Sequence, residues 1–351
     1  MKHIPAILAA LLLAAACDKA QEAPATSKQE ETGTIEFQIS TSQATKAISQ
    51  YTDVKPYETA VKSVQLLLFD ADGKISNYIN GTALSGSIST TAGSKTVWAV
   101  INGPDLSTVK LLSSVEGAIF DISLNGTGAS GSFVMAGSTN CTVSASAPVN
   151  CTIAAKRFLS RIALVSVTNS LPAGYGNLTV NRVFLSNVVG GISGKGEFIG
   201  GCRYINQNGR ADNNPRNAAD IIGTAGNEAS CPELTCSTRN LIVANAQTNA
   251  PSSPILLYAY PNSCTVNPNG FQSAYEPRKT VLVVEAQVKN DTYYYPVVLK
   301  DGVGRNKLYS IGLTVTALGS DDPEHVIEKG TANFSITVDD WENGAVYEET
   351  I

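Results

Sequence analysis

The stretch Val61-Lys-Ser-Val-Gln-Leu-Leu-Leu-Phe-Asp-Ala-Asp-Gly73 decides the fold of this chain. Almost every position after Ser63 is apolar, and the run stops at a cluster of aspartate, alanine and glycine that is typical of a turn. The aspartates also resemble the opening of a calcium loop, but residues 76–81 carry no carboxylate to close such a loop. We therefore expect a buried strand followed by a hairpin turn.

A period of two dominates the rest of the chain. Ile35, Phe37 and Ile39 alternate with polar residues, which puts three large side chains on one face of a strand. The segment 105–114 has apolar residues at helical spacing and predicts a helix. Other short apolar runs that end in turn residues predict strands at 97–101, 132–135, 161–167, 179–185, 255–260, 280–288, 293–299, 309–316 and 331–338.

The spacing of these strands favours an all-β chain with two β-sandwich domains in tandem. Strands recur at regular intervals without the strand and helix alternation of a parallel sheet. A length of 351 residues also favours two domains. Because Pro172, Gly174 and Gly176 cluster between the two halves, we place the domains at 47–170 and 171–351.

Composition excludes several classes of function. The net charge of −5 comes from 25 basic and 30 acidic residues spread without blocks, so a nucleic-acid surface is not expected. Of the two histidines, His3 lies in the leader, so His325 alone remains for metal or triad chemistry. A glycosidase would need two facing carboxylates, for which the sequence gives no positional signal. We expect no catalytic residue, no metal and no cofactor.

The first residues predict export. Lys2 and His3 precede an apolar run at 4–16, which is shorter than the roughly 20 residues that span a bilayer and indicates a signal peptide. The run ends in Leu13-Ala-Ala-Ala-Cys17, which resembles a bacterial lipobox, so residues 1–17 would end in a cysteine that is acylated and tethers the precursor to a membrane. The alternative is a plain cleavage site with an incidental cysteine. The polar residues 18–33 are typical of a linker.

The remaining cysteines favour disulfides over metal binding. An even number of cysteines in an exported chain is typical of disulfide bonding, although the pairing stays open. Cys141 and Cys151 flank a segment that contains Pro148, so a clip across a hairpin is the natural pairing. No second cysteine pair or histidine near 231–236 completes a zinc site. The disulfide candidates are Cys141, Cys151, Cys202, Cys231, Cys236 and Cys264.

Several of these segments, taken in order, carry a resemblance to a known family. The stretch at 61–73, Thr96-Val-Trp-Ala-Val-Ile-Asn102 and Lys156-Arg-Phe-Leu-Ser-Arg-Ile-Ala-Leu-Val165 resemble the N-terminal domain of the fimbrillins, the type V pilus subunits of Bacteroidales. Residues 322–327 and 331–341 resemble the tail of the major, stalk-forming subunits. The resemblance implies tandem transthyretin-like, Greek-key sandwiches.

The resemblance also implies a mechanism. The lipoprotein precursor would reach the outer membrane, a trypsin-like surface protease would remove its first strand, and the exposed groove would accept a strand from an identical subunit, head to tail. The mature protein would stand in a cell-surface fimbrium with accessory tip and anchor proteins, and it would support adhesion.

Residues of this chain match the parts of that mechanism. Ile35, Phe37 and Ile39 would form the removable strand within a propeptide at 18–46. Lys46 and Ala47 match the place of the cleavage site, where arginine before alanine is commoner. Val346, Tyr347 and Ile351 are the donor candidates.

Two alternatives stay open at this point. Residues 332–338 could be a donor or a strand of their own domain, because the run is long enough for a native strand. The chain could also be a monomeric surface lipoprotein that binds glycans or a host protein through its loops. Protease dependence separates the two functions, because only the polymer needs a cut to assemble.

Overall fold

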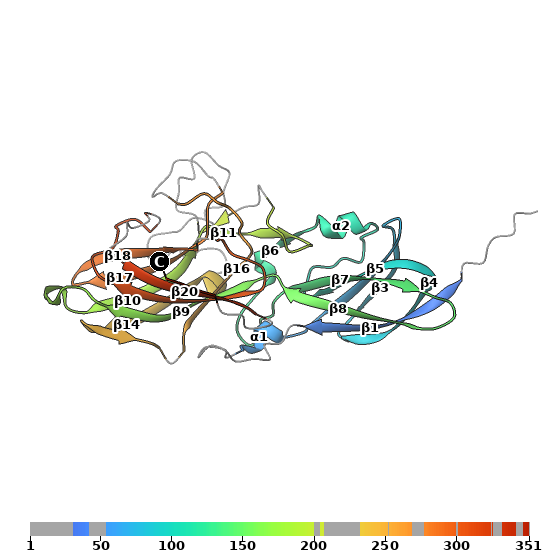
Figure 1. The fold of residues 1–351 in the computed structure, drawn as a ribbon, viewed down its shortest axis with the longest axis horizontal. Coiled ribbons are helices and arrows are strands. Elements are labelled where there is room, and N and C mark those ends of the chain that lie inside the picture. Colours follow the sequence, from blue (N-terminus) through green and yellow to red (C-terminus); the bar gives the residue numbers. More distant parts are fainter. Residues whose placement is uncertain are drawn as a thin grey trace, which may run out of the picture.

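The computed structural model shows an almost entirely β-stranded chain, as predicted. It describes residues 31–41, 54–199, 204–206, 232–251, 253–268, 277–299, 301–323, 325, 332–341 and 347–350. Strands β1 to β5, β7 and β8 gather at one end of the long axis, and most of the later strands gather at the other (Figure 1). No helix in these ranges is long and apolar enough to cross a membrane.

The N-terminal half is a seven-stranded sheet that wraps around its own core. The strand order is β3-β2-β5-β7-β8-β1-β4, so β3 and β4 are the two edges. Buried apolar side chains from β1, β2, β4, β5, β7 and β8 meet inside in one cluster. The strands are β1 (Thr32–Thr41), β2 (Val64–Asp70), β3 (Ile75–Gly81), β4 (Ser85–Thr91), β5 (Gly93–Ile101), β7 (Met135–Val143) and β8 (Val149–Arg157).

Strand β2 forms the centre of the stretch that decides the fold. It is apolar at successive positions because both of its faces are buried: Leu66 and Leu68 face the inner core, whereas Leu67 and Phe69 face a second core on the other side. The predicted turn follows it, with Gly73 at φ +78° and the Asp72 carboxylate bound to the Lys74 ammonium at 2.7 Å. The hairpin turn is confirmed.

The predicted helix at 105–114 is wrong. The helix α2 spans only Leu112–Glu116, because the preceding backbone has other partners. The Asp105 carboxylate accepts a hydrogen bond from the Ser107 N–H at 2.9 Å, and the Lys110 carbonyl accepts one from the Ile75 N–H at 2.9 Å. These contacts tie the segment to a turn and to the start of β3, which competes with helical bonding.

The C-terminal half contains two sheets packed around the larger core. One sheet has the order β14-β10-β17-β18; the other has the order β15-β9-β19-β20-β21, and β16 also pairs with β9. The strands are β10 (Leu178–Ser186), β14 (Cys236–Val243), β17 (Val281–Val288), β18 (Asp291–Val298), β9 (Ser160–Asn169), β15 (Gln247–Asn249), β16 (Ile255–Ala259), β19 (Lys307–Val315), β20 (Ala332–Asp340) and β21 (Tyr347–Thr350).

Strand β9 shifts the division between the sheets. It pairs with β19 and β16, so its hydrogen bonds belong to the C-terminal half although it precedes the expected border at residue 170. The sheets therefore divide between β8 and β9. The remaining elements are β6 (Ile119–Asp121), β11 (Val188–Val189), β12 (Gly191–Ser193), β13 (Tyr204–Ile205), α1 (Pro56–Thr59), α3 (Pro232–Thr235) and the 3-10 helices η1 (Ile122–Leu124) and η2 (Ala173–Tyr175).

A buried ion pair joins the two halves. Glu58 of α1 is fully buried and forms a salt bridge with Arg161 of β9, whose Nε donates to Glu58 Oε1 at 2.9 Å. The Tyr258 hydroxyl donates to the same oxygen at 2.7 Å, and Arg157 Nε donates to the Glu58 carbonyl at 2.7 Å. The carboxylate is therefore paired and hydrogen-bonded, which is the condition for burying a charge.

Trp341 closes this junction from the C-terminal side. Its ring is 1% exposed and stacks on Tyr258 with centroids 6.5 Å apart. The guanidinium carbons of Arg157 and Arg161 lie 4.5 and 5.2 Å from the ring centroid, in the geometry of cation–π contacts. The tryptophan therefore packs in the interior.

We predict that Glu58→Ala lowers the free energy of unfolding by about 3–5 kcal/mol, because it leaves the Arg161 guanidinium buried and unpaired. Urea unfolding followed by tryptophan fluorescence measures the change, since Trp341 lies against the same arginine. Lys74→Ala is the matched control: it removes an ion pair whose side chains are 72% and 54% exposed, and it should leave stability nearly unchanged. Equal stability of Glu58→Ala and the parent would contradict the role of the junction.

Candidate functional site: the seat of strand β1

Strand β1 is inserted between two other strands of the sheet. It pairs antiparallel with β4, where Ile35 stands opposite Ile88, and parallel with β8, where Phe37 stands opposite Cys151. The Ile39 N–H adds a hydrogen bond to the Leu84 carbonyl at 2.7 Å. Both backbone edges of β1 are therefore used, and its departure would leave β4 and β8 each with an open edge.

The side chains of β1 alternate as the sequence predicts. Ile35, Phe37 and Ile39 are 0%, 7% and 3% exposed and belong to the inner core, whereas Glu36 and Gln38 are exposed. Gly86 of β4 makes room for the aromatic ring, because a Cβ there would lie 3.1 Å from the Phe37 ring. We call the core positions and strand edges that β1 occupies, between β4 and β8, the β1 seat.

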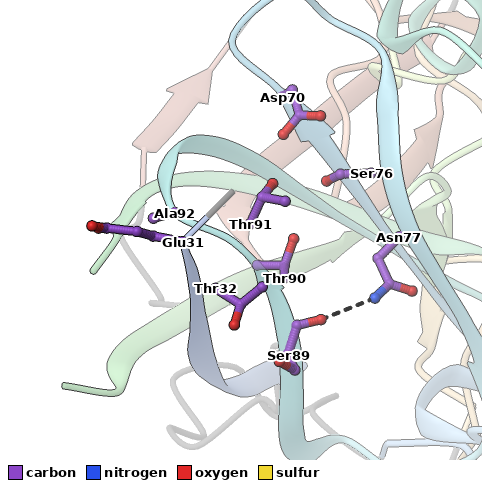
Figure 2. Close-up of a pocket in the computed structure, with 9 residues that line it drawn as sticks. All are labelled: Glu31, Thr32, Asp70, Ser76, Asn77, Ser89, Thr90, Thr91 and Ala92. Carbon is purple, nitrogen blue, oxygen red and sulfur yellow. Dashed lines mark hydrogen bonds between the residues drawn. The ribbon is translucent and has the colours of Figure 1, made fainter. Parts of the chain in front are cut away.

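A polar cleft lies where β1 enters the sheet (Figure 2). It has a volume of about 750 Å³ and opens between the edge strands β3 and β4. Asn77 Nδ2 donates to the Ser89 carbonyl at 3.2 Å across this seam, and the Ala92 N–H donates to the Glu31 carbonyl at 2.7 Å. The lining residues are Glu31, Thr32, Asp70, Ser76, Asn77, Ser89, Thr90, Thr91 and Ala92.

The cleft extends the β1 seat to the entry of the strand. Its lining carries carboxylate, hydroxyl and amide groups and small side chains, without an aromatic residue. Thr32, the first residue of β1, pairs with Thr91 on the cleft wall. The cleft therefore borders the β1 seat at the first residue of the strand.

The expected processing residues lie outside the described part of the chain. Cys17, Lys46 and Ala47 belong to the ranges 1–30 and 42–53, so the lipid site and the cleavage site stay predictions. Description resumes at Val54, just before α1 and its buried Glu58.

The structure resolves one of the open alternatives about the C-terminal residues. Strand β20 pairs with β19 over its whole length, from Ala332 opposite Val315 to Asp340 opposite Lys307, so it is a strand of its own domain. Strand β21 pairs with β20 and forms the outer edge of that sheet, with Tyr347 opposite Val338. Val346 and Ile351 lie outside the described residues, and the donor role of the tail stays a prediction.

The structure brings two of the six cysteines together. Cys141 of β7 packs against the inner core to which Cys151 of β8 belongs, and both are thiols in this structure. Burial and the neighbouring Cys141 raise the pKa of the Cys151 thiol to about 12, so it stays protonated at neutral pH. Cys236 and Cys264 are half-buried. Cys202 and Cys231 lie outside the described residues.

The Glu58 junction is not predictable from the local sequence. Glu58 sits in a short polar segment with no periodicity to mark it, so nothing in the pattern indicates burial. A faint signal exists in Arg157 and Arg161, two charges within an otherwise apolar run. Buried arginines need acidic partners, but the pattern does not say which acid supplies the charge.

The described residues contain no group of three histidine, cysteine or carboxylate side chains that could hold a metal ion. His325 is exposed. Burial raises the pKa of Tyr258 above the usual range, which keeps its hydroxyl protonated as a donor to Glu58.

We predict that Phe37→Ala destabilises the N-terminal sheet by about 3–5 kcal/mol, because it empties a packed position of the seat. The rate of hydrogen exchange at the β4 and β8 amides should also rise in this variant, since both strands pair with β1. Gln38→Ala is the matched control, because the neighbouring side chain is exposed on the same strand. Similar exchange in both variants would show that the aromatic ring does not hold the strand.

Comparison with known proteins finds solved structures whose fold is similar to that of this chain. No protein-family model matches the sequence, and no curated protein matches it. A candidate cell adhesion protein from Parabacteroides distasonis has a TM-score of 0.61 and 15% identity, covering 89% of this chain and 100% of that chain. A fimbrilin from Porphyromonas gingivalis has a TM-score of 0.56 and 15% identity, covering 90% of this chain and 99% of that chain.

A further structure extends this set. A fimbrial assembly protein from Parabacteroides distasonis has a TM-score of 0.51 and 11% identity, covering 91% of this chain and 100% of that chain. The likeness covers nearly the full length in each case, and it therefore includes both halves of the molecule. The chain has the all-β fold of Bacteroidales fimbrilins and candidate cell adhesion proteins.

Proposed function

We propose that this protein is the structural subunit of a cell-surface fimbrium that supports adhesion and assembles by strand replacement. In this proposal a protease cuts after Lys46, β1 leaves its seat, and the C-terminal strand of an identical subunit takes its place. The subunits then follow one another head to tail. The observation that carries the proposal is the insertion of β1 between β4 and β8.

The energetics of the β1 seat favour replacement over an empty groove. Three large apolar side chains leave with β1, and each contributes about 1.5–3 kcal/mol when fully buried. Two strand edges also lose their hydrogen-bond partners. A strand from a second subunit restores both the apolar burial and the hydrogen bonds, because its alternate side chains fill the pockets and its main chain pairs with the two edges.

The Glu58 junction supports a cut that releases β1 alone. Residues 42–53 connect β1 to α1, so a cut after Lys46 separates the strand from everything that follows. Glu58 is held by Arg161, Arg157 and Tyr258 from the rest of the molecule. The new N-terminal region would therefore stay anchored while β1 is held by non-covalent contacts only.

The position of β21 suits a donor. It is an edge strand that pairs with β20 alone, so its transfer to another subunit breaks one ladder. Deeper strands of the same sheet, such as β19, pair on both sides. Among the described strands of this sheet, β21 thus loses few hydrogen bonds when it detaches, and it lies nearest the end of the chain.

The comparisons support the class of function. Proteins with this fold include a fimbrilin, a fimbrial assembly protein and a candidate cell adhesion protein. We extend this to accessory tip and anchor partners, to a trypsin-like surface protease, and to lipid attachment of the precursor at Cys17 in the outer membrane. A monomeric surface lipoprotein, the alternative, would use its loops and would need no cut.

We predict that Lys46→Gln abolishes assembly, because a trypsin-like protease requires the basic side chain before the cut. Cells that display the variant should show no high-mass ladder on unboiled gels, whereas the parent should. Lys110→Gln is the matched control, since it removes an exposed lysine far from the linker in sequence. An unchanged ladder in Lys46→Gln would show that this lysine is not the trigger.

We predict that deleting residues 346–351 leaves a stable subunit that does not form filaments. The deletion removes an edge strand and no residue of the described cores, so the melting temperature should match that of the intact chain. A synthetic peptide of the tail should cap cleaved intact subunits, and a scrambled peptide of the same composition should not. Filaments of normal length from the deleted chain would refute the donor assignment.

A further inference from the structure

The hairpin of β7 and β8 forms one wall of the β1 seat and has an unusual distribution of contacts. Its paired ladder consists of Met135 opposite Arg157 and Ala136 opposite Lys156, both at the base of the hairpin. Arg305 reinforces this base: its Nη2 donates to the carbonyls of Ala136 at 2.7 Å and Lys156 at 2.8 Å. Toward the tip, the described residues 137–155 add no further ladder pair between the two strands.

Strand β8 relies on β1 toward that tip. Residues from Val149 to Ala155 of β8 pair with β1 in parallel, with Cys151 opposite Phe37. If β1 leaves, this part of β8 loses its ladder on one side and has only its packing on β7 on the other. The tip of the hairpin is therefore the weak point of the empty seat.

The two thiols stand across the hairpin at this weak point. Counted from the base pairs, Cys141 and Cys151 are equally far along the two strands, although no ladder joins the strands at that level. The two strands still approach closely just beyond the base, because a Cβ on Gly137 would lie 2.0 Å from the Ala154 carbonyl oxygen. The two thiols lie within side-chain hydrogen-bond reach of each other, which is the close approach that a disulfide requires.

Contacts of the side chains agree with this placement. Both cysteines face the inner core, Cys151 as a member and Cys141 packed against it. The Cys141 thiol also contributes to the raised pKa of Cys151, which requires the two groups to be neighbours. A chance meeting of two cysteines on one face and at one level of a hairpin is uncommon, and an exported chain meets oxidising conditions.

We propose that Cys141 and Cys151 form a disulfide that holds the β7–β8 wall of the β1 seat in place when β1 leaves. The bond itself does not depend on the proposed function, whereas its role during strand loss rests on it. The closed bond would hold the tip of the hairpin as Arg305 holds the base. An incoming strand would then meet a preformed edge of β8.

Formation of the bond requires an oxidant, which we identify as a protein disulfide of a thiol–disulfide oxidoreductase. The Cys141 thiolate, the more exposed of the two, attacks one sulfur of that disulfide and expels the other as a thiolate. The Cys151 thiol then loses its proton and attacks the Cys141 sulfur of the mixed disulfide. Two electrons pass to the oxidoreductase, which leaves as a dithiol with the two protons.

The bond can be tested on the exported full chain by alkylation. The protein is denatured and alkylated with or without prior reduction, and then digested with trypsin. Both cysteines lie in the single peptide 111–156, because no lysine or arginine interrupts it. We expect this peptide to carry no alkyl group when the protein is not reduced and two alkyl groups when it is reduced first. Without reduction, its mass should be that of a single peptide, not linked to another, and two hydrogens lower than the mass of the dithiol form. Labelling without reduction, or a link to another peptide, would overturn the proposal.

The role of the bond can be tested by hydrogen exchange of the full chain. Reduction should speed exchange of the β8 amides at 149–152 and leave β19 unchanged. A double variant, Cys141→Ala with Cys151→Ala, should show the faster β8 exchange with and without reductant. Cys264→Ala is the matched control and should behave as the parent. If reduction does not change the exchange rate of the β8 amides, the proposed role of the disulfide is overturned. The alkylation experiment still decides whether the disulfide forms. The Lys46→Gln gel tests the proposed function separately.

Discussion

The ion pair between Glu58 and Arg161 is the constraint on which the rest of the structure depends. It brings the first short helix, the last strand of the N-terminal sheet and the first strand of the C-terminal sheets to one point. A buried carboxylate is costly without a partner, so the two halves have few ways to separate while both charges stay paired. Trp341 and Tyr258 cover the pair and exclude water from it. The elongated shape in Figure 1 is therefore fixed near its middle.

The N-terminal sheet contrasts with this fixed centre. Its first strand contributes three side chains to the core and uses both of its backbone edges, yet none of the contacts described at the Glu58 junction comes from it. The residues that stabilise the Glu58 junction all follow residues 42–53 in the sequence. The molecule thus separates the parts that must persist from the strand that the proposed mechanism removes.

Local sequence patterns predicted the strands on which burial imposes a period, which are β1, β2, β5, β9, β10 and β16 to β20, but they missed others, among them β7 and β8. Alternation at Ile35, Phe37 and Ile39 gave the inward face of β1, and the unbroken apolar run at 64–69 reflects a strand covered on both sides. The helix at 105–114 failed because a helical spacing of three leucine and valine residues says nothing about competing backbone partners such as Ile75. The border at residue 170 missed the division of the sheets because strand pairing is a long-range property.

The β1 seat could be predicted only in part for the same reason. The sequence identified the strand and its core side chains, but the partners β4 and β8, the space made by Gly86 and the facing cysteines depend on residues far along the chain. The Glu58 junction was beyond local patterns altogether. A single acidic residue in a polar segment has no periodic neighbour to mark it as buried.

The mixed pairing of β1 has a directional consequence. Because β1 runs antiparallel to β4 and parallel to β8, a strand that reproduces these same two pairings runs the same way as β1. In a contact of this kind, one subunit contributes its β1 seat and the next contributes its C-terminal strand. The two surfaces differ, so the contact would not form a closed two-fold dimer. Under the proposed function, a chain of such subunits would have two unlike ends, one with a vacant seat and one with an unused tail, and it would lengthen at either end only by the matching half of the joint.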